Sequence, residues 1–319
     1  MNCYTSFITS QLEKKLNKKL IHKAITAVSG KLFDKEKQIE LAFACILANG
    51  HLLIEDKPGL GKTTLANAMS QVLGLNFRRI QFTSDMLPSD VLGVSIFQPQ
   101  TSGFKFFKGP IFTQLLLADE LNRGTPRTQS ALLEAMAEKQ VSIDGNTYQL
   151  QQPFFVIATQ NPSDEAGTFP LPDSQLDRFS VSISLGYPSA IAERKLYSTE
   201  FSASFNQALP TIINIEQLTQ MQHQVETIHA NNEVKDYLQA LIKKTRNDSK
   251  LLYGLSPRAG LSMYRLSQSL AYMDNRDYMI PEDVQNAFLP IASHRLKSNS
   301  IEISPDKILT DILHETRSP

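Results

Sequence analysis

The residues best placed to do chemistry lie in one short segment, Asp56-Lys-Pro-Gly-Leu-Gly-Lys-Thr-Thr64. An apolar run at 52–54 precedes the segment and predicts a buried strand, and a helix-like stretch at 65–73 follows it. Glycines at 59 and 61 allow backbone N–H groups to converge on an anion, and a helix N-terminus adds positive potential. This order of strand, glycine loop, Gly-Lys-Thr and helix predicts a phosphate-binding loop.

Each polar residue of this loop has an expected role. Lys62 is expected to reach the β- and γ-phosphates of a nucleotide, and the Thr63 hydroxyl to ligate Mg²⁺. The segment departs from G-x-x-x-x-G-K-[ST] at its first position, where Asp56 replaces glycine. An ordinary strand-to-helix turn that contains Gly-Lys-Thr is the alternative. The predicted nucleotide-binding residues are Pro58, Gly59, Leu60, Gly61, Lys62, Thr63 and Thr64.

A second acidic motif follows the loop along the chain. The aliphatic run at 115–118 predicts a buried strand that ends in Asp119 and Glu120. At the carboxyl end of a strand, Asp119 can hold a hydrated Mg²⁺ beside Thr63, and Glu120 can polarise the attacking water. Two acidic residues that merely end a strand are the alternative. The position of the motif downstream of a phosphate-binding loop favours the catalytic interpretation.

Two more polar residues lie near strand ends. Asn161 follows a predicted strand at 152–158, and Arg178 precedes the last predicted strand, at 181–185. The carboxyl ends of parallel strands are where ligands bind in open α/β sheets, which favours a ligand role for Asn161. The alternatives are a turn residue for Asn161 and a local ion pair for Arg178.

The order of elements predicts an α/β core followed by a helical region. The sequence indicates helices at 4–30, 34–49 and 126–140 and hairpins at 94–108 and 141–151. Strand signals stop near Tyr187, and apolar residues then recur at helical spacing at 189–200, 215–229, 232–246, 257–273 and 281–296, with Pro290 expected to kink or split the last run. We therefore expect a nucleotide-binding core at 1–187, a helical lid at 188–296 and a polar C-terminal tail at 297–319.

Composition narrows the class of protein. The 319 residues are 41% apolar and 20% charged, which is typical of a globular protein. Lys plus Arg and Asp plus Glu are each 32, and this zero net charge argues against a dedicated nucleic-acid binder. The two cysteines form no disulfide framework, and Cys45 lies in an apolar helical stretch that predicts a core position. No apolar run approaches a membrane span and the N-terminus lacks a signal-peptide core, so we expect a cytoplasmic protein.

Several further motifs resemble one family. Leu117-Ala-Asp-Glu-Leu-Asn-Arg123, Thr128-Gln-Ser-Ala-Leu-Leu-Glu-Ala-Met136, Ala158-Thr-Gln-Asn-Pro162, Gln175-Leu-Asp-Arg-Phe179 and Ser256-Pro-Arg258 follow in order. Together with the phosphate-binding loop, they resemble the MoxR family of AAA+ ATPases over about residues 22–296. The resemblance implies an α/β fold of AAA+ type, with a parallel sheet flanked by helices, two hairpin insertions and a small all-helical lid domain.

The resemblance also implies a role for each residue, with ATP and Mg²⁺ as the nucleotide and cofactor. Asp119 and Glu120 match Walker B as the magnesium carrier and the water-orienting base, and Asn161 matches sensor 1. Arg178 matches the arginine finger that is donated to a neighbouring subunit, and Arg258 matches sensor 2. The hairpins match the helix-2 insert and the pre-sensor-1 hairpin. Leu32-Phe33-Asp34 stands where the family usually carries a Gly-Gln near the adenine.

The expected partners follow from the resemblance as well. An arginine finger acting across subunits implies a homo-oligomer, hexameric by resemblance, with a head-to-tail contact that closes into a ring. The family is associated with chaperone-like remodelling or maturation of protein clients, often through partners with von Willebrand factor A domains. The alternatives are a nucleic-acid-remodelling ATPase of helicase or activator type, an ATP-gated scaffold and a small-molecule kinase.

Overall fold

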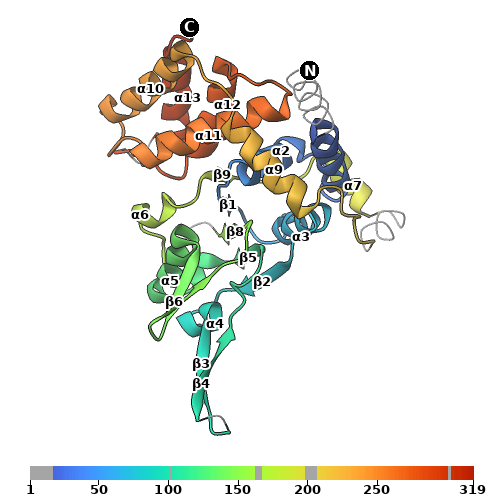
Figure 1. Cartoon of the computed structure of the whole chain (residues 1–319). Helices are drawn as coiled ribbons and strands as arrows, with labels where there is room; N and C mark the ends of the chain where they lie inside the picture. The colour runs from blue at the N-terminus through green and yellow to red at the C-terminus, as the bar shows by residue number, and fades with distance from the viewer. Residues whose placement is uncertain (1–16, 101, 162–166, 198–206, 301–302) are drawn as a thin grey trace, which may run out of the picture.

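A computed structural model describes residues 17–100, 102–161, 167–197, 207–300 and 303–319. Its centre is a five-stranded parallel sheet in the order β2-β5-β8-β1-β9. The strands are β1 (Leu52–Glu55), β2 (Phe77–Gln81), β5 (Leu115–Asp119), β8 (Phe155–Gln160) and β9 (Val181–Ile183). The predicted α/β class with a parallel sheet is confirmed (Figure 1).

Strands β1, β5, β8 and β9 are largely apolar because both faces of the sheet are covered there, whereas the edge strand β2 exposes Arg78, Arg79 and Gln81. Alternate residues face opposite sides: Leu52 and Ile54 belong to one buried cluster, and Leu53 belongs to the other. Helix α5 (Pro126–Glu138) covers the second side with Leu132 and Met136. The first side is covered by α2 (Glu36–Leu47) and α3 (Lys62–Val72).

Both predicted hairpins are present. The first pairs β3 (Gly93–Gln98) with β4 (Gly103–Lys108), and the second pairs β6 (Gln140–Ile143) with β7 (Asn146–Gln149). The short helix α4 (Pro88–Leu92) leads into the first hairpin. Figure 1 shows β3 and β4 extending away from the sheet, on the side opposite to helices α10 to α13.

The second half of the chain is helical, as predicted. After the short helix α6 (Asp173–Leu176) and strand β9, the helices are α7 (Ala190–Leu196), α9 (Ile215–Glu226), α10 (Asn232–Asn247), α11 (Pro257–Met273), α12 (Pro281–Ala292) and α13 (Pro305–Glu315). Helix α12 continues through Pro290 for two more residues rather than being split there. The predicted polar tail contains α13, whose buried Ile308, Leu309 and Ile312 form an apolar face.

The path of the chain after α7 decides where the lid lies. Ile212 and Ile213 both donate backbone hydrogen bonds to the carbonyl of Val72, at the end of α3. This extended segment leads the chain past α3 to α9, and Gln222 of α9 donates to the carbonyl of Ile46 in α2. Helices α9 and α11 thereby pack beside α2 (Figure 1).

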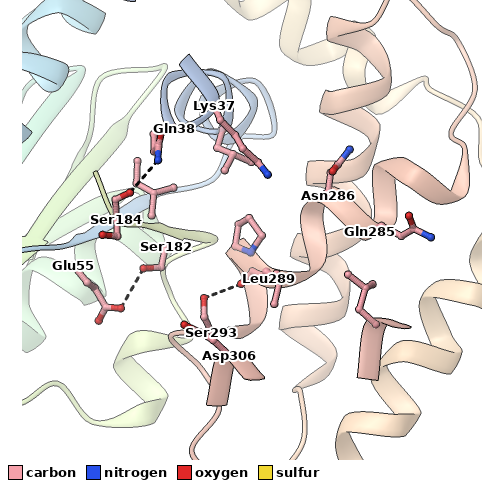
Figure 2. A pocket seen from close by; sticks show the side chains of 14 residues that line it. Lys37, Gln38, Glu55, Ser182, Ser184, Gln285, Asn286, Leu289, Ser293 and Asp306 are labelled. Atoms are coloured by element: carbon pink, nitrogen blue, oxygen red, sulfur yellow. Dashed lines mark hydrogen bonds between the residues drawn. The ribbon is translucent and has the colours of Figure 1, made fainter. Parts of the chain in front are cut away.

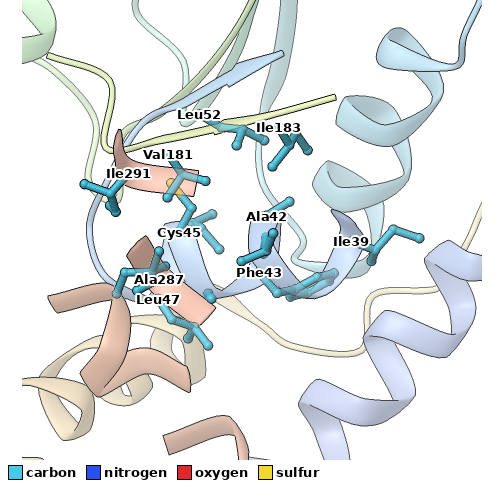
Figure 3. Packing of buried hydrophobic residues seen from close by; sticks show 14 of the residues in the cluster. Ile39, Ala42, Phe43, Cys45, Leu47, Leu52, Val181, Ile183, Ala287 and Ile291 are labelled. Atoms are coloured by element: carbon cyan, nitrogen blue, oxygen red, sulfur yellow. The ribbon is translucent and has the colours of Figure 1, made fainter. Parts of the chain in front are cut away.

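Helix α2 lies between the sheet and the lid. Figure 3 shows Ala42 and Cys45 among Leu52 and Val181 of the sheet, with Ala287 of α12 close by. Burial raises the pKa of the Cys45 thiol, as expected for an inert core cysteine. Sheet and lid therefore share one continuous hydrophobic core.

Some predicted features lie partly outside the described residues. The predicted helix 4–30 is described from residue 17, where the chain is helical to residue 29. Cys3, Pro162 and the end of the helical run at 189–200 lie outside the described residues. Among the described helices, none has the length and hydropathy that crossing a lipid bilayer requires.

Candidate functional site

The loop between β1 and α3 has the backbone that its sequence predicts. Gly59 and Gly61 adopt φ angles of +85° and +94°, in the left-handed region that other residues rarely occupy. Gly61 is the N-cap of α3, so the helix begins at Lys62. A side chain at Gly59 would meet no atom within 4 Å, which leaves an open concave backbone in front of the helix N-terminus.

Lys62 joins this loop to the end of a neighbouring strand. Its side chain is buried, and Nζ donates to the carbonyl oxygen of Asp56 at 2.6 Å and to Oδ1 of Asn161 at 3.3 Å. The parallel register that pairs Glu55 with Gln160 places these two strand ends side by side. Two of the predicted site residues, 99 positions apart in sequence, are therefore in direct contact.

Asp56 is bonded on its other side to the segment that follows β9. Its buried carboxylate accepts hydrogen bonds from Ser184 Oγ at 2.9 Å and from the backbone N–H groups of Leu185 and Gly186. A glycine at position 56 would lack these bonds. The departure from the phosphate-loop pattern thus has a structural role, which is to tie the start of the loop to the chain that leads into α7.

Asp119 lies at the carboxyl end of β5, where it is 7% exposed. Its Oδ1 accepts a hydrogen bond of 2.6 Å from Thr159 Oγ1, and its Oδ2 forms an ion pair of 2.6 Å with Arg79. β5 and β1 are separated in the sheet by β8 alone, so their carboxyl ends are roughly 10 Å apart. Asp119 therefore faces the same edge of the sheet as Lys62.

The predicted metal ligands have suitable chemistry for Mg²⁺. Thr63 occupies the second position of α3 with an exposed side chain, and Asp119 supplies a buried carboxylate at the same sheet edge. Hydroxyl and carboxylate oxygens are the donors that Mg²⁺ prefers, with water and phosphate oxygens completing its shell. The residues present fit this ion.

Glu120 adopts a left-handed backbone conformation, with a φ of +53°. Its N–H donates to Thr159 Oγ1 at 2.9 Å, so one threonine hydroxyl links both acidic residues. Its carboxylate forms an ion pair of 2.9 Å with Arg123 Nε. Asn122 donates from Nδ2 to the carbonyl oxygen of Asn161 at 3.0 Å, which connects the segment after β5 to the end of β8. Glu120 is thereby held at the sheet edge that also carries Lys62 and Asn161.

A cavity of about 300 Å³ adjoins the phosphate-binding loop. It is lined by Gly59, Gly61 and Thr64 of the loop region. Its apolar wall comes from the segment before α2 and from the region of α7, namely Leu32, Phe33, Pro188, Ala192 and Leu196. An apolar cavity next to a phosphate-binding backbone is suited to a planar base.

The two arginines lie at the opposite end of the sheet. Arg178 and Arg258 line a second cleft, of about 420 Å³, which also includes His51 from the start of β1 and Val181 from the start of β9. The phosphate-binding loop follows the other end of β1, about 13 Å away along a four-residue strand. Arg178 is half-buried and donates from Nη1 to the carbonyl of Leu133 at 2.7 Å.

A third cavity, of about 700 Å³, lies between the outer strand β9 and helices α2 and α12. Figure 2 shows Glu55 bonded to Ser182 and Gln38 bonded to Ser184 along this strand. Burial raises the pKa of the Glu55 carboxyl group. None of the predicted nucleotide, metal or catalytic residues lines this cavity.

Sequence reasoning missed several contributors to the site. Thr159 carried a usable signal, because it is a polar residue in an otherwise apolar strand that runs up to Asn161. Arg79 carried none, since its partner Asp119 is distant in sequence. Phe33 was noted only as a departure from the family's pattern, and the wall it forms with Pro188 depends on tertiary packing.

Comparison with known proteins gives concordant matches over most of the chain. Residues 51–181 match the ATPase family associated with various cellular activities (AAA), and residues 243–312 match the AAA lid domain. YeaC of Bacillus subtilis is 39% identical over 304 residues, covering 94% of this chain and 95% of YeaC. Chaperone MoxR1 of Mycobacterium tuberculosis is 35% identical over 312 residues, covering 94% of this chain and 82% of MoxR1.

The fold has a close counterpart among solved structures. A crystal structure from Cytophaga hutchinsonii, described as that of a "putative ATPase", superposes with a TM-score of 0.90 at 33% sequence identity. The match covers 98% of this chain and 99% of that one. The architecture described above therefore also occurs, over nearly the full length of both chains, in an experimentally determined structure.

Proposed function

The chain belongs to the MoxR family of AAA+ ATPases, and from this membership we propose that it couples Mg²⁺-dependent ATP hydrolysis in a ring of identical subunits to remodelling of a protein client. The observation that carries the proposal is the division of its polar groups between two ends of the sheet. Lys62, Asn161 and Glu120 gather at one end, whereas Arg178 and Arg258 line a cleft at the other.

This division argues that each catalytic centre is completed by a second copy. The strand β1 separates the two ends, and an arginine side chain in the cleft cannot reach the loop of its own subunit. In a head-to-tail ring, the cleft of one subunit faces the phosphate-binding loop of the next. We therefore assign Arg178 and Arg258 to the neighbouring subunit's triphosphate.

At the loop, this chain's own residues bind and orient the nucleotide. The backbone from Pro58 to Gly61 and the N-terminus of α3 bind the phosphates, and Lys62 exchanges the carbonyl of Asp56 for β- and γ-phosphate oxygens. Phe33 and Leu196 enclose the base. Thr63 and Asp119 would hold Mg²⁺, which would supply charge neutralisation for the triphosphate.

Hydrolysis requires a positioned water molecule and stabilised charge rather than a covalent nucleophile. Asn161 and Glu120 orient the water, and Glu120 leaves Arg123 to accept a hydrogen bond from it. The water oxygen bonds to the γ-phosphorus as the bond to the ADP oxygen breaks, and Glu120 takes up the proton that the water loses. Arg178 and Arg258 from the neighbour stabilise the charge that develops, and an arginine finger contributes about 10³–10⁵ in rate.

The first hairpin supports action on a protein. Val94, Ile96, Phe97, Phe104 and Phe107 are between 43% and 75% exposed along β3 and β4. Exposed apolar side chains grouped on one projecting element are typical of a protein-contact surface. The name of the relative Chaperone MoxR1 favours the same assignment. A von Willebrand factor A-domain protein is the adaptor that the family resemblance implies.

ATP hydrolysis by the purified chain, with Mg²⁺ and with EDTA, tests the catalytic part. Lys62→Ala should lose nucleotide binding, whereas Glu120→Gln should bind ATP and hydrolyse it about 10²-fold or more slowly. Lys57→Ala, which changes an exposed lysine of the same loop, is the matched control and should retain both. Equal hydrolysis by Glu120→Gln and the unmodified chain would contradict the assignment.

The ATP-bound Glu120→Gln protein also serves as a trap for the client. Proteins that co-purify with it but not with Lys62→Ala should depend on ATP and fall away after exchange to ADP. Capture that is independent of nucleotide would argue against an ATP-driven cycle on a client.

A further inference from the structure

One carboxylate beside the predicted arginine finger is bound by two residues of the lid. Asp177 directly precedes Arg178. Arg295, which follows α12, donates from Nε to Asp177 Oδ1 at 2.8 Å. Ser256 Oγ lies 3.1 and 3.0 Å from the two carboxylate oxygens of Asp177. Donors more than 75 positions away in sequence therefore converge on the residue next to Arg178.

The Arg295 guanidinium also binds the main chain on both sides of Arg178. Its Nη1 donates to the carbonyl of Ser180 at 3.1 Å, and its Nη2 donates to the carbonyls of Asp177, at 3.4 Å, and Phe179. A guanidinium is planar and presents its donors in a fixed fork. The short segment that carries Arg178 is consequently held in one orientation relative to the lid.

Burial makes this ion pair hard to open. The side chain of Arg295 is 4% exposed and that of Asp177 is 21% exposed. Burial lowers the pKa of Arg295, and the hydrogen bond and charge of Asp177 oppose that effect. A buried guanidinium without its carboxylate would be strongly unfavourable. The pair is therefore expected to stay closed while the protein is folded.

The same carboxylate is connected to the helix that carries Arg258. Ser256 is the N-cap of α11, and its Oγ accepts from the N–H of Ala259 at 3.0 Å while it donates to Asp177. Arg258 is the second residue of that helix, with an exposed side chain in the cleft that Arg178 also lines. Asp177 thus lies between the chain segments that present the two arginines.

We propose that Asp177 and Arg295 are positioning residues that hold Arg178 and Arg258 as one unit facing the triphosphate of the neighbouring subunit. The proposal rests on the proposed function, because it assumes that both arginines act across a subunit boundary. Asp177 and Arg295 do not touch the nucleotide themselves. A shift of the lid relative to the sheet moves both arginines together, because the same network ties each of them to α11 and α12.

Mixed rings separate the subunit that donates the arginines from the subunit that binds ATP. In the reference mixture, Lys62→Ala subunits donate arginines and Arg178→Ala subunits bind ATP. Adding Asp177→Asn to the Lys62→Ala donor should lower kcat by about tenfold to a hundredfold, since misplacement by about 1 Å can cost that much. The KM for ATP should stay the same, because the nucleotide is bound by the other subunit.

Adding Asp177→Asn instead to the Arg178→Ala acceptor should leave the rate of the mixture unchanged. A purely structural role would lower the rate in both placements. An equal loss in both placements, or no loss in the donor placement, would overturn the proposal.

Lys297→Ala in the donor is the matched control. Lys297 pairs with the Asp173 carboxylate at 2.6 Å and also links the lid to the core, but the two side chains are 57% and 42% exposed. This control should keep the rate of the reference mixture. A loss as large as that of Asp177→Asn would show that any lid contact has this effect and would overturn the proposal.

Arg295→Lys provides a second variant, which retains the charge and loses the fork. It should reproduce the donor-only loss, and a rate equal to that of the reference mixture would overturn the role assigned to the guanidinium. If the reference mixture itself stays inactive while the unmodified chain hydrolyses ATP, then the action of Arg178 across subunits fails, and the present proposal fails with it. That outcome is distinct from an active reference mixture that is insensitive to Asp177.

Discussion

Thr159 is the residue that joins the side chain of Asp119 to the backbone of Glu120 at the end of β5. Its hydroxyl donates to Asp119 and accepts from the N–H of Glu120, at 2.6 and 2.9 Å. The bond to Glu120 accompanies a left-handed backbone, which costs of order 1 kcal/mol for a residue other than glycine and needs support from its surroundings. Thr159 therefore holds the carboxylate of Asp119 and the backbone of Glu120, whose own carboxylate is paired with Arg123.

Thr159→Val removes the hydroxyl and keeps the shape of the side chain. We expect hydrolysis to fall about tenfold or more, because the Asp119 carboxylate and the backbone N–H of Glu120 both lose a fixed partner, while binding of ATP through Lys62 persists. Steady-state hydrolysis with varied Mg²⁺ and nucleotide binding by fluorescence would measure the two effects separately. Thr159→Ser should retain most activity; a Val variant as active as the Ser variant would refute the role.

His51 gives the protein a defined response to pH. Burial lowers the pKa of His51 to about 4, from about 6.5 in an unfolded chain. Between these values the unfolded chain binds a proton that the folded chain does not, so stability falls as the pH decreases through this window. From pH 7 to pH 5 the loss attributable to His51 is about 2 kcal/mol.

Thermal unfolding at pH 7 and pH 5 measures this response. His51→Gln retains an acceptor for the N–H of Val156, which donates to His51 Nδ1 at 3.1 Å, and removes the titration. The unfolding midpoint of the variant should fall by less from pH 7 to pH 5 than that of the unmodified chain. His294, whose pKa burial also lowers, contributes the same sign in both proteins. An identical pH response in the two proteins would contradict the assignment to His51.

At the scale of elements, the phosphate-binding loop is coupled to the chain that leads into α7. The Asp56 carboxylate binds the backbone of Leu185 and Gly186, while its carbonyl accepts from Lys62. When phosphate replaces the Asp56 carbonyl as the partner of Lys62, Asp56 is therefore affected. The side chain of this residue also binds the chain just after β9. The same position in the general phosphate-loop pattern is glycine, which could not make this link.

Asp56→Gly restores the general pattern and should nevertheless destabilise the protein. The carboxylate accepts charge-assisted hydrogen bonds, each worth about 1.5–3 kcal/mol, and their loss should lower the unfolding midpoint by several degrees. Differential scanning fluorimetry compares the unfolding midpoints of Asp56→Gly, Asp56→Asn and the unmodified chain. Asp56→Asn keeps one acceptor oxygen, so its midpoint should lie between those of the other two proteins. A Gly variant as stable as the unmodified chain would show that the link is dispensable.

The sequence predicted most elements because their patterns are local. Four strands of the sheet contain short apolar runs, β2 and both hairpins carry alternating residues, and α3 begins where Gly61 allows its turn. Helix α13 was predicted only as part of a polar tail, because its few apolar residues gain their burial from α10 and α12. Helix α12 continues through Pro290, although the proline removes the backbone hydrogen bond that residue 290 would donate to the carbonyl of Asn286.

The site was predictable to the extent that it depends on strand ends. The motifs around Lys62, Asp119 and Asn161 each end or follow a strand, and parallel strands bring such ends to one edge. The cleft that Arg258 enters was not predictable. Its location depends on packing of the lid against α2 and against Asp177, and those contacts join residues 176 and 79 positions apart in sequence. No local pattern encodes them.

At the scale of the whole molecule, the proposed function assigns half of a catalytic centre to each end of the sheet. One end carries the loop, the acidic residues and Asn161; the other carries Arg178 and Arg258 in a separate cleft. The continuous core that joins sheet and lid through α2 fixes the distance between these ends. Assembly of identical copies is the arrangement that brings the two kinds of end together.

The most direct measurement of this account is ATP hydrolysis by an equal mixture of Lys62→Ala and Arg178→Ala proteins, each of which should be inactive alone. Random head-to-tail assembly places an intact loop beside an intact arginine at about a quarter of the interfaces, so the mixture should recover about that share of the unmodified rate. A mixture that stays as inactive as its components, while assembling as the unmodified chain does, would contradict the claim that each centre is shared between two copies.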